Sequence, residues 1–332
     1  MSEGTVIVTG CAGFIGWKVS EMLLDKGYSV IGIDNMNDYY DPKLKEWRLT
    51  GLRRHSRFIF FNLDISDREG ITSILSPESV KKFMDSYPEV IINLAARAGV
   101  RASVENPWVY LETNYLGTLN LLEVAKEFGI KRFVLASTSS IYGLNSIPFK
   151  EEDRTDHPLA PYSATKKAVE VLCYTYHYLY GIDVIIPRYF TVYGPAGRPD
   201  MSYFKFIKNI DRGIPIPVYG DGRQKRDFTY IDDIANGTIR CMTLKGYNII
   251  NLGNDNPVEL MYVINLIEEN LGKRASIEWF GMHSADVPAT WADIESARKM
   301  LHWSPTVRIE EGIRNTVEWY KENRDFILTL RD

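Results

Sequence analysis

Short runs of apolar residues alternate with amphipathic stretches along the chain up to residue 188. The runs are rich in β-branched residues and are bounded by glycine or polar residues, which predicts buried strands. The expected strands cover residues 5–9, 29–34, 58–61, 90–94, 133–136 and 182–187. Helical spacing lies between them, at residues 44–54, at 77–85 and over much of 106–128. This alternation predicts an α/β fold with a doubly wound, parallel Rossmann sheet and right-handed crossovers.

The pattern changes after residue 188. Proline and glycine crowd residues 194–200 and 213–222, which predicts loops. Later stretches predict helices at 231–244, 258–271, 294–301 and 310–323, and one more strand at 247–252. We therefore expect a sheet domain over residues 1–188, completed by about 231–252. A smaller, interleaved C-terminal substrate lobe would take residues 189–230 and 253–332.

Composition narrows the function classes. The chain has 332 residues, 45% of them hydrophobic, which is enough for a sizeable core. A net charge of −4 without a long basic run argues against a nucleic-acid surface. No apolar run approaches the ~18 residues of a membrane span, and a strand pattern begins almost at once, so no signal peptide is expected. Three cysteines without ligand or disulfide spacing suit a reducing cytoplasm.

A glycine-rich turn follows the first expected strand. It reads Gly10-x-x-Gly13-x-x-Gly16 and opens an amphipathic stretch that ends at residues 26–27. Glycines in such a turn let the backbone approach a pyrophosphate closely. The helix N-terminus supplies N–H donors and a positive dipole. The turn therefore predicts a dinucleotide cofactor.

Carboxylates follow two of the expected strands. Asp34 closes the second strand, 18 residues beyond the last glycine of the turn. In this position it accepts from the adenosine ribose hydroxyls and repels a 2′-phosphate, which favours NAD over NADP. Asp64, after the third strand, is a candidate for the adenine edge or else a helix cap. Small residues at 94–96 let a cofactor lie close to the fourth strand, or pack in the core.

Candidate catalytic groups follow the fifth expected strand. Hydroxyls at residues 137–140 stand at its carboxyl end, where sheet proteins bind ligands. Tyr162 and Lys166 are four residues apart and share one helix face. Because an ammonium beside a phenol favours the phenolate, we expect a lowered pKa for Tyr162, which makes it a base for an alcohol proton. A solvated helix face has the same spacing, but the preceding glycine turn favours the catalytic interpretation.

Arginines are candidate clamps for a second diphosphate. Arg101, Arg198, Arg223 and Arg226 could hold it bidentately, although surface arginines are often only solvated. The five histidines have no ligand spacing, so no metal is expected.

These motifs together resemble the extended short-chain dehydrogenase/reductase family, which includes nucleotide-sugar epimerases and dehydratases. The resemblance covers residues 6–320 and includes the glycine turn, the Tyr-x-x-x-Lys pair and segments 188–195, 226–233 and 286–290. It implies a Rossmann domain that binds NAD, a UDP-sugar substrate and a homodimer built through a four-helix bundle.

The resemblance also implies roles for individual residues. Tyr162 would be the base, Lys166 its electrostatic partner, and Thr138 the hydroxyl that bridges Tyr162 and the substrate. The cofactor would contact Gly10, Gly13, Phe14, Ile15, Gly16, Asp34, Asn35, Asn37, Asp64, Ile65, Leu94, Ala95, Ala96, Arg97, Asn114, Ser137, Tyr162, Lys166 and Tyr189. The UDP-sugar would contact Arg101, Thr138, Ser139, Ser140, Tyr162, Thr191, Arg198, Val218, Tyr219, Arg226 and Asp286.

The choice of reaction depends on a few positions. Residues 34–41 and 197–201 resemble loops of the family members that act on UDP-glucuronate. Dehydratases place an Asp-Glu pair where this chain has Ser139-Ser140, and similar decarboxylases carry Glu in place of Ser140. Neutral-hexose epimerases usually have Asn where Thr191 stands. We therefore expect 4-epimerisation of UDP-glucuronate to UDP-galacturonate through a 4-keto sugar.

Other functions stay open. The first alternative is 4-epimerisation of UDP-glucose or UDP-N-acetylglucosamine. A UDP-glucuronate decarboxylase and a catalytically dead NAD-binding scaffold are less favoured alternatives. The scaffold is disfavoured because the hydroxyl, phenol and lysine are all present. The chain departs from the family pattern at Asn93, where many members carry histidine, and at Arg97, where they carry a small or amide residue. Arg97 would lie close to the cofactor phosphates or the sugar pocket.

Overall fold

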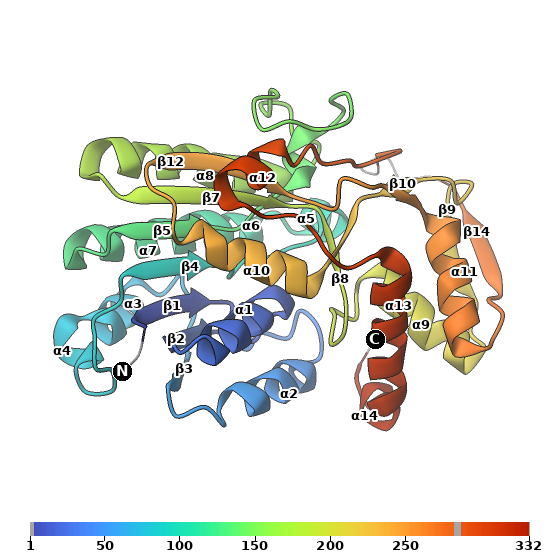
Figure 1. Cartoon of the computed structure of the whole chain (residues 1–332), viewed down its shortest axis with the longest axis horizontal. Helices are drawn as coiled ribbons and strands as arrows, with labels where there is room; N and C mark the ends of the chain where they lie inside the picture. The colour runs from blue at the N-terminus through green and yellow to red at the C-terminus, as the bar shows by residue number, and fades with distance from the viewer. Residues whose placement is uncertain (1–2, 282–286, 332) are drawn as a thin grey trace.

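A parallel sheet forms the centre of the molecule (Figure 1). The structure, a computed structural model, describes residues 3–281 and 287–331. The strands run in the order β12-β7-β5-β4-β1-β2-β3, and β6 also pairs with β7. Their bounds are β1 Thr5–Thr9, β2 Ser29–Asp34, β3 Phe58–Asn62, β4 Val90–Asn93, β5 Arg132–Leu135, β6 Ser137–Thr138, β7 Asp183–Tyr189 and β12 Tyr247–Leu252. The predicted parallel, doubly wound sheet is confirmed.

Alternate side chains of each strand enter two separate cores, one on each face of the sheet. In β1, Val6 and Val8 join one core and Ile7 joins the other. The first core packs against α1 (Phe14–Asp25), α2 (Pro42–Leu52) and α10 (Ile231–Cys241). The second packs against α3 (Arg68–Leu75), α4 (Pro77–Val80), α7 (Gly117–Phe128) and α8 (Pro161–Tyr180). Because both faces are covered, the strands appear in the sequence as continuous apolar runs.

Several helices differ from the predicted ones. The expected helix at 77–85 stops at Val80, and α3 and α5 (Val100–Glu105) were not predicted. The stretch at 106–128 is three successive pieces, namely α6 (Trp108–Tyr110), the π-helical segment η1 (Leu111–Leu116) and α7. A π-helical turn inside an α-helix often marks a functional position.

The smaller lobe contains more regular structure than the expected loops. Three two-stranded pairs form, β8 (Thr191–Tyr193) with β11 (Phe228–Tyr230), β10 (Lys225–Arg226) with β13 (Val258–Glu259), and β9 (Ile216–Tyr219) with β14 (Ile277–Phe280). The helices are α9 (Ser202–Arg212), α11 (Leu260–Leu271), α12 (Glu295–Leu301), α13 (Ile309–Glu322) and α14 (Arg324–Leu328). Figure 1 shows α9, α11 and α13 gathered at one side of the sheet. The exact domain boundaries remain a prediction.

Aromatic rings join the smaller lobe to α2. Trp47 of α2 packs edge-on against Trp319 of α13, with ring centroids 5.4 Å apart, and stacks on Phe326 of α14. The backbone N–H of Arg331 donates to Asp41, which also caps the N-terminus of α2. The C-terminal helices therefore rest on the helix that follows the second strand. In the part of the chain that the structure describes, no helix has the length and apolar character of a membrane span.

Candidate active site

The glycine turn is packed so closely that larger residues would not fit. Gly10 has φ +69°, and a Cβ there would lie 2.8 Å from the backbone nitrogen of Ala95. A Cβ on Gly16 would lie 2.1 Å from the carbonyl oxygen of Gly10. Gly13 caps α1, whose first turn holds Phe14 and the rest of the predicted turn. The turn thus presents backbone N–H groups at a helix N-terminus, which suits a pyrophosphate.

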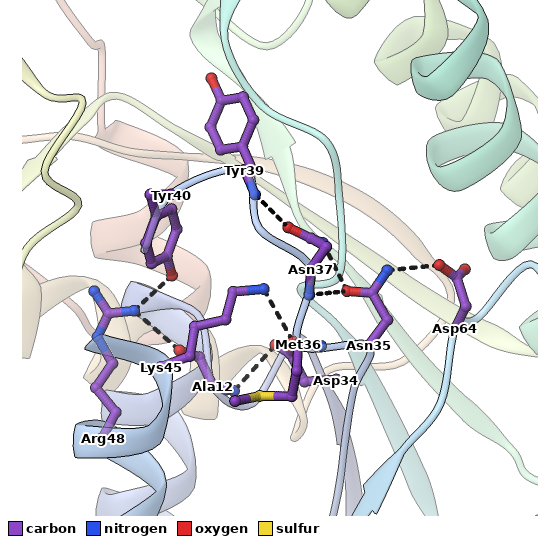
Figure 2. Close-up of polar contacts among 10 residues, drawn as sticks. All are labelled: Ala12, Asp34, Asn35, Met36, Asn37, Tyr39, Tyr40, Lys45, Arg48 and Asp64. Carbon is purple, nitrogen blue, oxygen red and sulfur yellow. Dashed lines mark hydrogen bonds and ion pairs between the residues drawn. The ribbon is translucent and has the colours of Figure 1, made fainter. Parts of the chain in front are cut away.

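Asp34 ends β2 beside this turn (Figure 2). It is buried and accepts hydrogen bonds from the backbone N–H groups of Ala12, at 3.2 Å, and Met36, at 2.9 Å. Lys45 of α2 forms a buried ion pair with it at 3.2 Å. The sequence interpretation missed Lys45, although its place in the helix after the strand was a usable signal. The carboxylate therefore lies beside the glycine turn and is held there by two backbone N–H groups and one ammonium.

The amides after Asp34 form a chain toward β3 (Figure 2). Asn37 donates to Asn35, and Asn35 donates to Asp64 at 2.6 Å. Asp64 also accepts two hydrogen bonds from Ser66. Burial raises the pKa of this carboxyl, but the hydrogen bonds outweigh burial and lower the pKa overall. The predicted cofactor residues 35, 37 and 64 are therefore connected, and Ile65 beside them is buried under Gly117.

Residues 94–97, which follow β4, pack against the glycine turn. Ala95 donates its backbone N–H to Thr9 at 3.2 Å, and residues 94–96 are half-buried. The side-chain amide of Asn114, in the π-helical segment, accepts from the backbone N–H of Arg97 at 2.8 Å and donates to its carbonyl at 3.1 Å. The Arg97 guanidinium lies 5.7 Å from the ring centroid of Tyr39. Asn93, the other position that departs from the family pattern, is buried and hydrogen-bonded to Thr9 and Thr118. Its role is therefore structural, within the core.

The three candidate catalytic residues come from neighbouring elements. Thr138 ends β6, and its hydroxyl bonds Ser140 at 3.1 Å in the 3-10 helix η2 (Ser139–Tyr142). Tyr162 and Lys166 lie on the first turns of α8. The hydroxyl of Thr138 lies near enough to the Tyr162 phenol to lower the phenol's pKa. The structure therefore places hydroxyl and phenol in the same part of the site.

The pKa of Tyr162 does not follow the expectation. Burial raises it above the usual range, while the hydrogen bond with Thr138 and the charge of Arg198 lower it by a smaller amount. Lys166 directs its Nζ at the carbonyl of Ala136, 2.9 Å away. Burial lowers the pKa of Lys166 to about 8. The predicted net lowering of the phenol pKa is wrong for this structure, because desolvation of the phenolate outweighs the nearby positive charge.

Two predicted cofactor residues have their hydroxyls turned to the interior. Ser137 donates to Glu170 of α8 at 2.6 Å, and the hydroxyl of Tyr189 bonds Thr238 of α10 at 2.8 Å. Their side-chain oxygens are thus already satisfied within the fold. Glu170, one turn beyond Lys166, was not predicted, and no sequence motif marks it.

Arg198 is the cation that faces the candidate base. Asp200 holds its guanidinium with two hydrogen bonds, at 3.0 and 2.5 Å. Tyr39 lies against it, 5.6 Å from the ring centroid, and the Tyr39 hydroxyl is 3.5 Å from Asp200. Thr191, at the start of β8, is half-buried like Ser139 and Ser140. Asp200 was not predicted, although it stands two residues beyond Arg198.

The remaining predicted substrate residues lie across the two lobes. Arg101 of α5 stacks over Tyr219 of β9, 4.2 Å from the ring centroid. Val218 is fully buried in β9, so this structure does not expose it to a ligand. Arg226 donates to the carbonyls of Lys225 and Pro288. Asp286 lies outside the described residues.

A comparison with protein-family models decides the family. The model described as "NAD dependent epimerase/dehydratase family" matches residues 6–253. The chain belongs to this family. The fold and the glycine turn agree with that assignment, since the cradle at Gly10 and Gly16 and the helix N-terminus fit the dinucleotide that the family name implies.

Named relatives within the epimerase/dehydratase family narrow the comparison. The UDP-glucuronate 4-epimerase of Thermodesulfobacterium geofontis is 53% identical over 99% of both chains. A crystal structure of UDP-glucuronic acid 4-epimerase from Bacillus cereus, in complex with UDP-glucuronic acid and NAD, has a TM-score of 0.87. It is 35% identical and covers 96% of this chain and 99% of its own. UDP-glucose 4-epimerase from Thermotoga maritima also has a TM-score of 0.87, at 29% identity and the same coverage.

Proposed function

We propose that this chain is an NAD-dependent 4-epimerase that interconverts UDP-glucuronate and UDP-galacturonate. The observation that carries the proposal is the grouping of Thr138, Tyr162 and Arg198. Thr138 can relay a proton to the Tyr162 phenol, and the nearby Arg198 guanidinium can bind a carboxylate. The 53% identical relative named for this activity supports it. So does the similarity to a structure holding UDP-glucuronic acid and NAD.

The chain's own residues provide the proton chemistry. Tyr162 takes the proton of the sugar C4 hydroxyl, through or beside Thr138, and returns it after inversion. The Lys166 ammonium would contact the ribose of a bound cofactor, and its charge would act against the rise in the Tyr162 pKa that burial causes. NAD, when bound, supplies the acceptor and then the donor of the C4 hydride. The glycine turn and Asp34 hold the dinucleotide, while the 4-keto sugar turns over and exposes its other face.

The carboxylate of the 4-keto intermediate needs restraint. A 4-keto uronic acid is a β-keto acid and loses CO₂ when its carboxylate bond aligns with the carbonyl π system. Short hydroxyl donors at Ser139, Ser140 and Thr191 can fix that torsion, and the guanidinium of Arg198 adds charge. Ser140 cannot act as an acid or base near neutral pH, which disfavours dehydration and decarboxylation.

Substrate choice is tested by NMR of the purified enzyme with UDP-glucuronate, UDP-glucose or UDP-N-acetylglucosamine, each alone. We expect conversion of UDP-glucuronate to UDP-galacturonate. Conversion of the neutral sugars only would replace the proposal by the second candidate, 4-epimerisation of a neutral UDP-hexose. The 29% identical UDP-glucose 4-epimerase structure is the observation that favours this candidate.

Cofactor identity is tested separately. Denaturing the purified protein and assaying the supernatant should release NAD, because the carboxylate of Asp34 repels a 2′-phosphate. Release of NADP alone, or no affinity for NAD, would contradict the role given to Asp34.

We also infer a homodimer in a reducing cytoplasm. The face of α8 exposes Val171 by 55% and Tyr178 by 76%, seven residues apart on one side of the helix. A second copy that packs there would bury both, as the family's four-helix bundle does. Val171→Glu/Tyr178→Glu should convert the dimer to a monomer in light scattering. The three cysteines are buried and unpaired, which suits a reducing compartment.

A further inference from the structure

Arg48 of α2 joins the glycine turn to the loop of residues 196–200, which we call the substrate loop. Its Nη1 donates to the carbonyl of Ala12, in the glycine turn, at 2.9 Å, and to the hydroxyl of Tyr40 at 2.6 Å (Figure 2). Its Nε and Nη2 donate to the carbonyl of Ala196 at 3.2 and 2.7 Å, and Nη2 reaches Gly197 at 3.3 Å. One side chain therefore contacts a residue 36 positions before it and another 148 positions after it in the sequence.

The chemistry of these contacts is unusual for a buried cation. Arg48 is fully buried, yet within residues 3–281 and 287–331 its hydrogen-bond acceptors are backbone carbonyls and one phenol. Buried charges are normally paired with a carboxylate. Here the planar fork of five N–H groups is used to fix the positions of carbonyl groups, which a lysine could not reproduce.

Two hydrogen bonds fix Ala12, the residue of the glycine turn that Arg48 contacts. Ala12 gives its N–H to Asp34 and its carbonyl to Arg48. Asp34 is in turn paired with Lys45, one helical turn before Arg48 on α2. The peptide that precedes the N-terminus of α1 is thus fixed from both ends by α2 and its ion pair.

The substrate side is a strained loop. Ala196 has φ +55°, in the left-handed region where a Cβ is unfavourable, and it is fully buried. Such conformations persist only where the surroundings hold them, and they cluster at functional sites. Arg48 provides two hydrogen bonds to this residue. The next residues along the loop include Arg198, the cation beside Tyr162.

We propose that Arg48 is a positioning residue, which holds Ala196 in its strained conformation and thereby sets Arg198 against the cofactor turn. The inference rests on the proposed function. It deepens that function by coupling the cofactor turn to the residue that restrains the substrate carboxylate. Because Arg48 is fully buried and bonded to the loop backbone, we expect its effect on the substrate to pass through Arg198.

The test is a double-mutant cycle with UDP-glucuronate, in which KM, kcat, CO₂ per turnover and bound NAD are measured. Wild-type turnover of UDP-glucuronate is measured first. Its absence defeats the proposed function, and the role of Arg48 is then judged by amide hydrogen exchange at residues 196–200. We expect Arg48→Lys to keep NAD and raise KM by about tenfold, with more CO₂ released. In the background of Arg198→Lys, the same change should cost less than about twofold, because the two act through one loop.

A rescue separates positioning from general stabilisation. Ala196→Gly removes the penalty of the left-handed conformation. Added to Arg48→Lys, it should therefore bring the raised KM most of the way back to the wild-type value. Arg53→Lys, on the exposed end of the same helix, is the matched control and should match wild type. Multiplicative losses in the cycle, or a failed rescue, overturn the proposal.

Should Arg48→Lys fail to fold, Tyr40→Phe keeps the test open, since it removes a single contact of Arg48. Faster amide hydrogen exchange at residues 196–200 in that variant is the expected result. Unchanged exchange there contradicts the proposal.

Discussion

Two arginine–carboxylate pairs are connected to the candidate base, one through the helix that carries Tyr162 and one through the charge of Arg198, and they differ in enclosure. Arg188 binds Glu170 with two hydrogen bonds, at 3.0 and 2.8 Å, and both side chains are only 1% exposed. Arg198 binds Asp200 in the same bidentate way, but the two are 21% and 31% exposed. The first pair connects β7 to α8, whereas the second lies within one loop.

The difference in enclosure indicates a difference in role. Glu170 also accepts from Ser137, and Arg188 also donates to Tyr142, so the first pair is locked in a buried network. A network of this kind fixes the helix that carries Tyr162. The partly exposed Arg198 can exchange a carboxylate partner for the substrate's. We therefore assign the Arg188–Glu170 pair to holding the helix that carries Tyr162. We assign Arg198 to binding the substrate.

The largest expected effect comes from the candidate base itself. Tyr162→Phe removes the general base and should lower kcat by about 10² to 10⁴, with the fold and bound NAD unchanged. Steady-state kinetics and NAD release after denaturation measure both. Full activity in this variant would remove Tyr162 from the mechanism.

Breaking the buried pair should mainly affect folding. Glu170→Ala leaves Arg188 charged and unpaired in the interior, which should reduce the free energy of unfolding by about 3–5 kcal/mol. The matched control is Glu295→Gln, which breaks an exposed pair with Lys299 and should cost about 0.5 kcal/mol or less. Urea unfolding compares them. Equal losses would refute the assignment of the structural role to the enclosed pair.

Breaking the exposed pair should mainly affect substrate binding. Arg198→Lys keeps the charge but loses the bidentate fork, so we expect KM for UDP-glucuronate to rise about tenfold and the CO₂ fraction to increase. Thermal stability should stay near that of wild type. Arg212→Lys, at the exposed end of α9, is the control. If Arg198→Lys is unfolded, or if its KM and CO₂ fraction are unchanged, the substrate-binding role given to Arg198 is wrong.

A smaller effect should appear in the pH profile. Burial depresses the pKa of Lys166 to about 8 from the ~10.4 of a free lysine, so the ammonium is present below pH 8 and lost above it. If the charge stabilises the phenolate, kcat/KM falls as the pH rises through about 8. Lys166→Arg stays charged across this range, and its residual activity should lack the decline. A decline at the same pH in both proteins would assign it to another group.

The sequence predicted the parts of the site that the backbone defines. Buried strands give continuous apolar runs, and a turn as tight as that at Gly10 admits only glycine, so both leave local patterns. The pKa of Tyr162 could not be predicted, because it depends on burial by distant segments. Glu170 and Arg48 were missed for the same reason, since their partners are far away in the sequence. Helix α9 was hidden between proline- and glycine-rich stretches.

The most direct test of the central claim follows the hydrogen at C4. UDP-glucuronate labelled with deuterium at C4 is incubated with the enzyme in ordinary water and followed by NMR. Because the C4 hydrogen leaves and returns as hydride within one closed site, UDP-galacturonate should form with the deuterium retained at C4 and with little CO₂ released. Loss of the label to solvent during epimerisation, or rapid formation of UDP-xylose, would contradict the account.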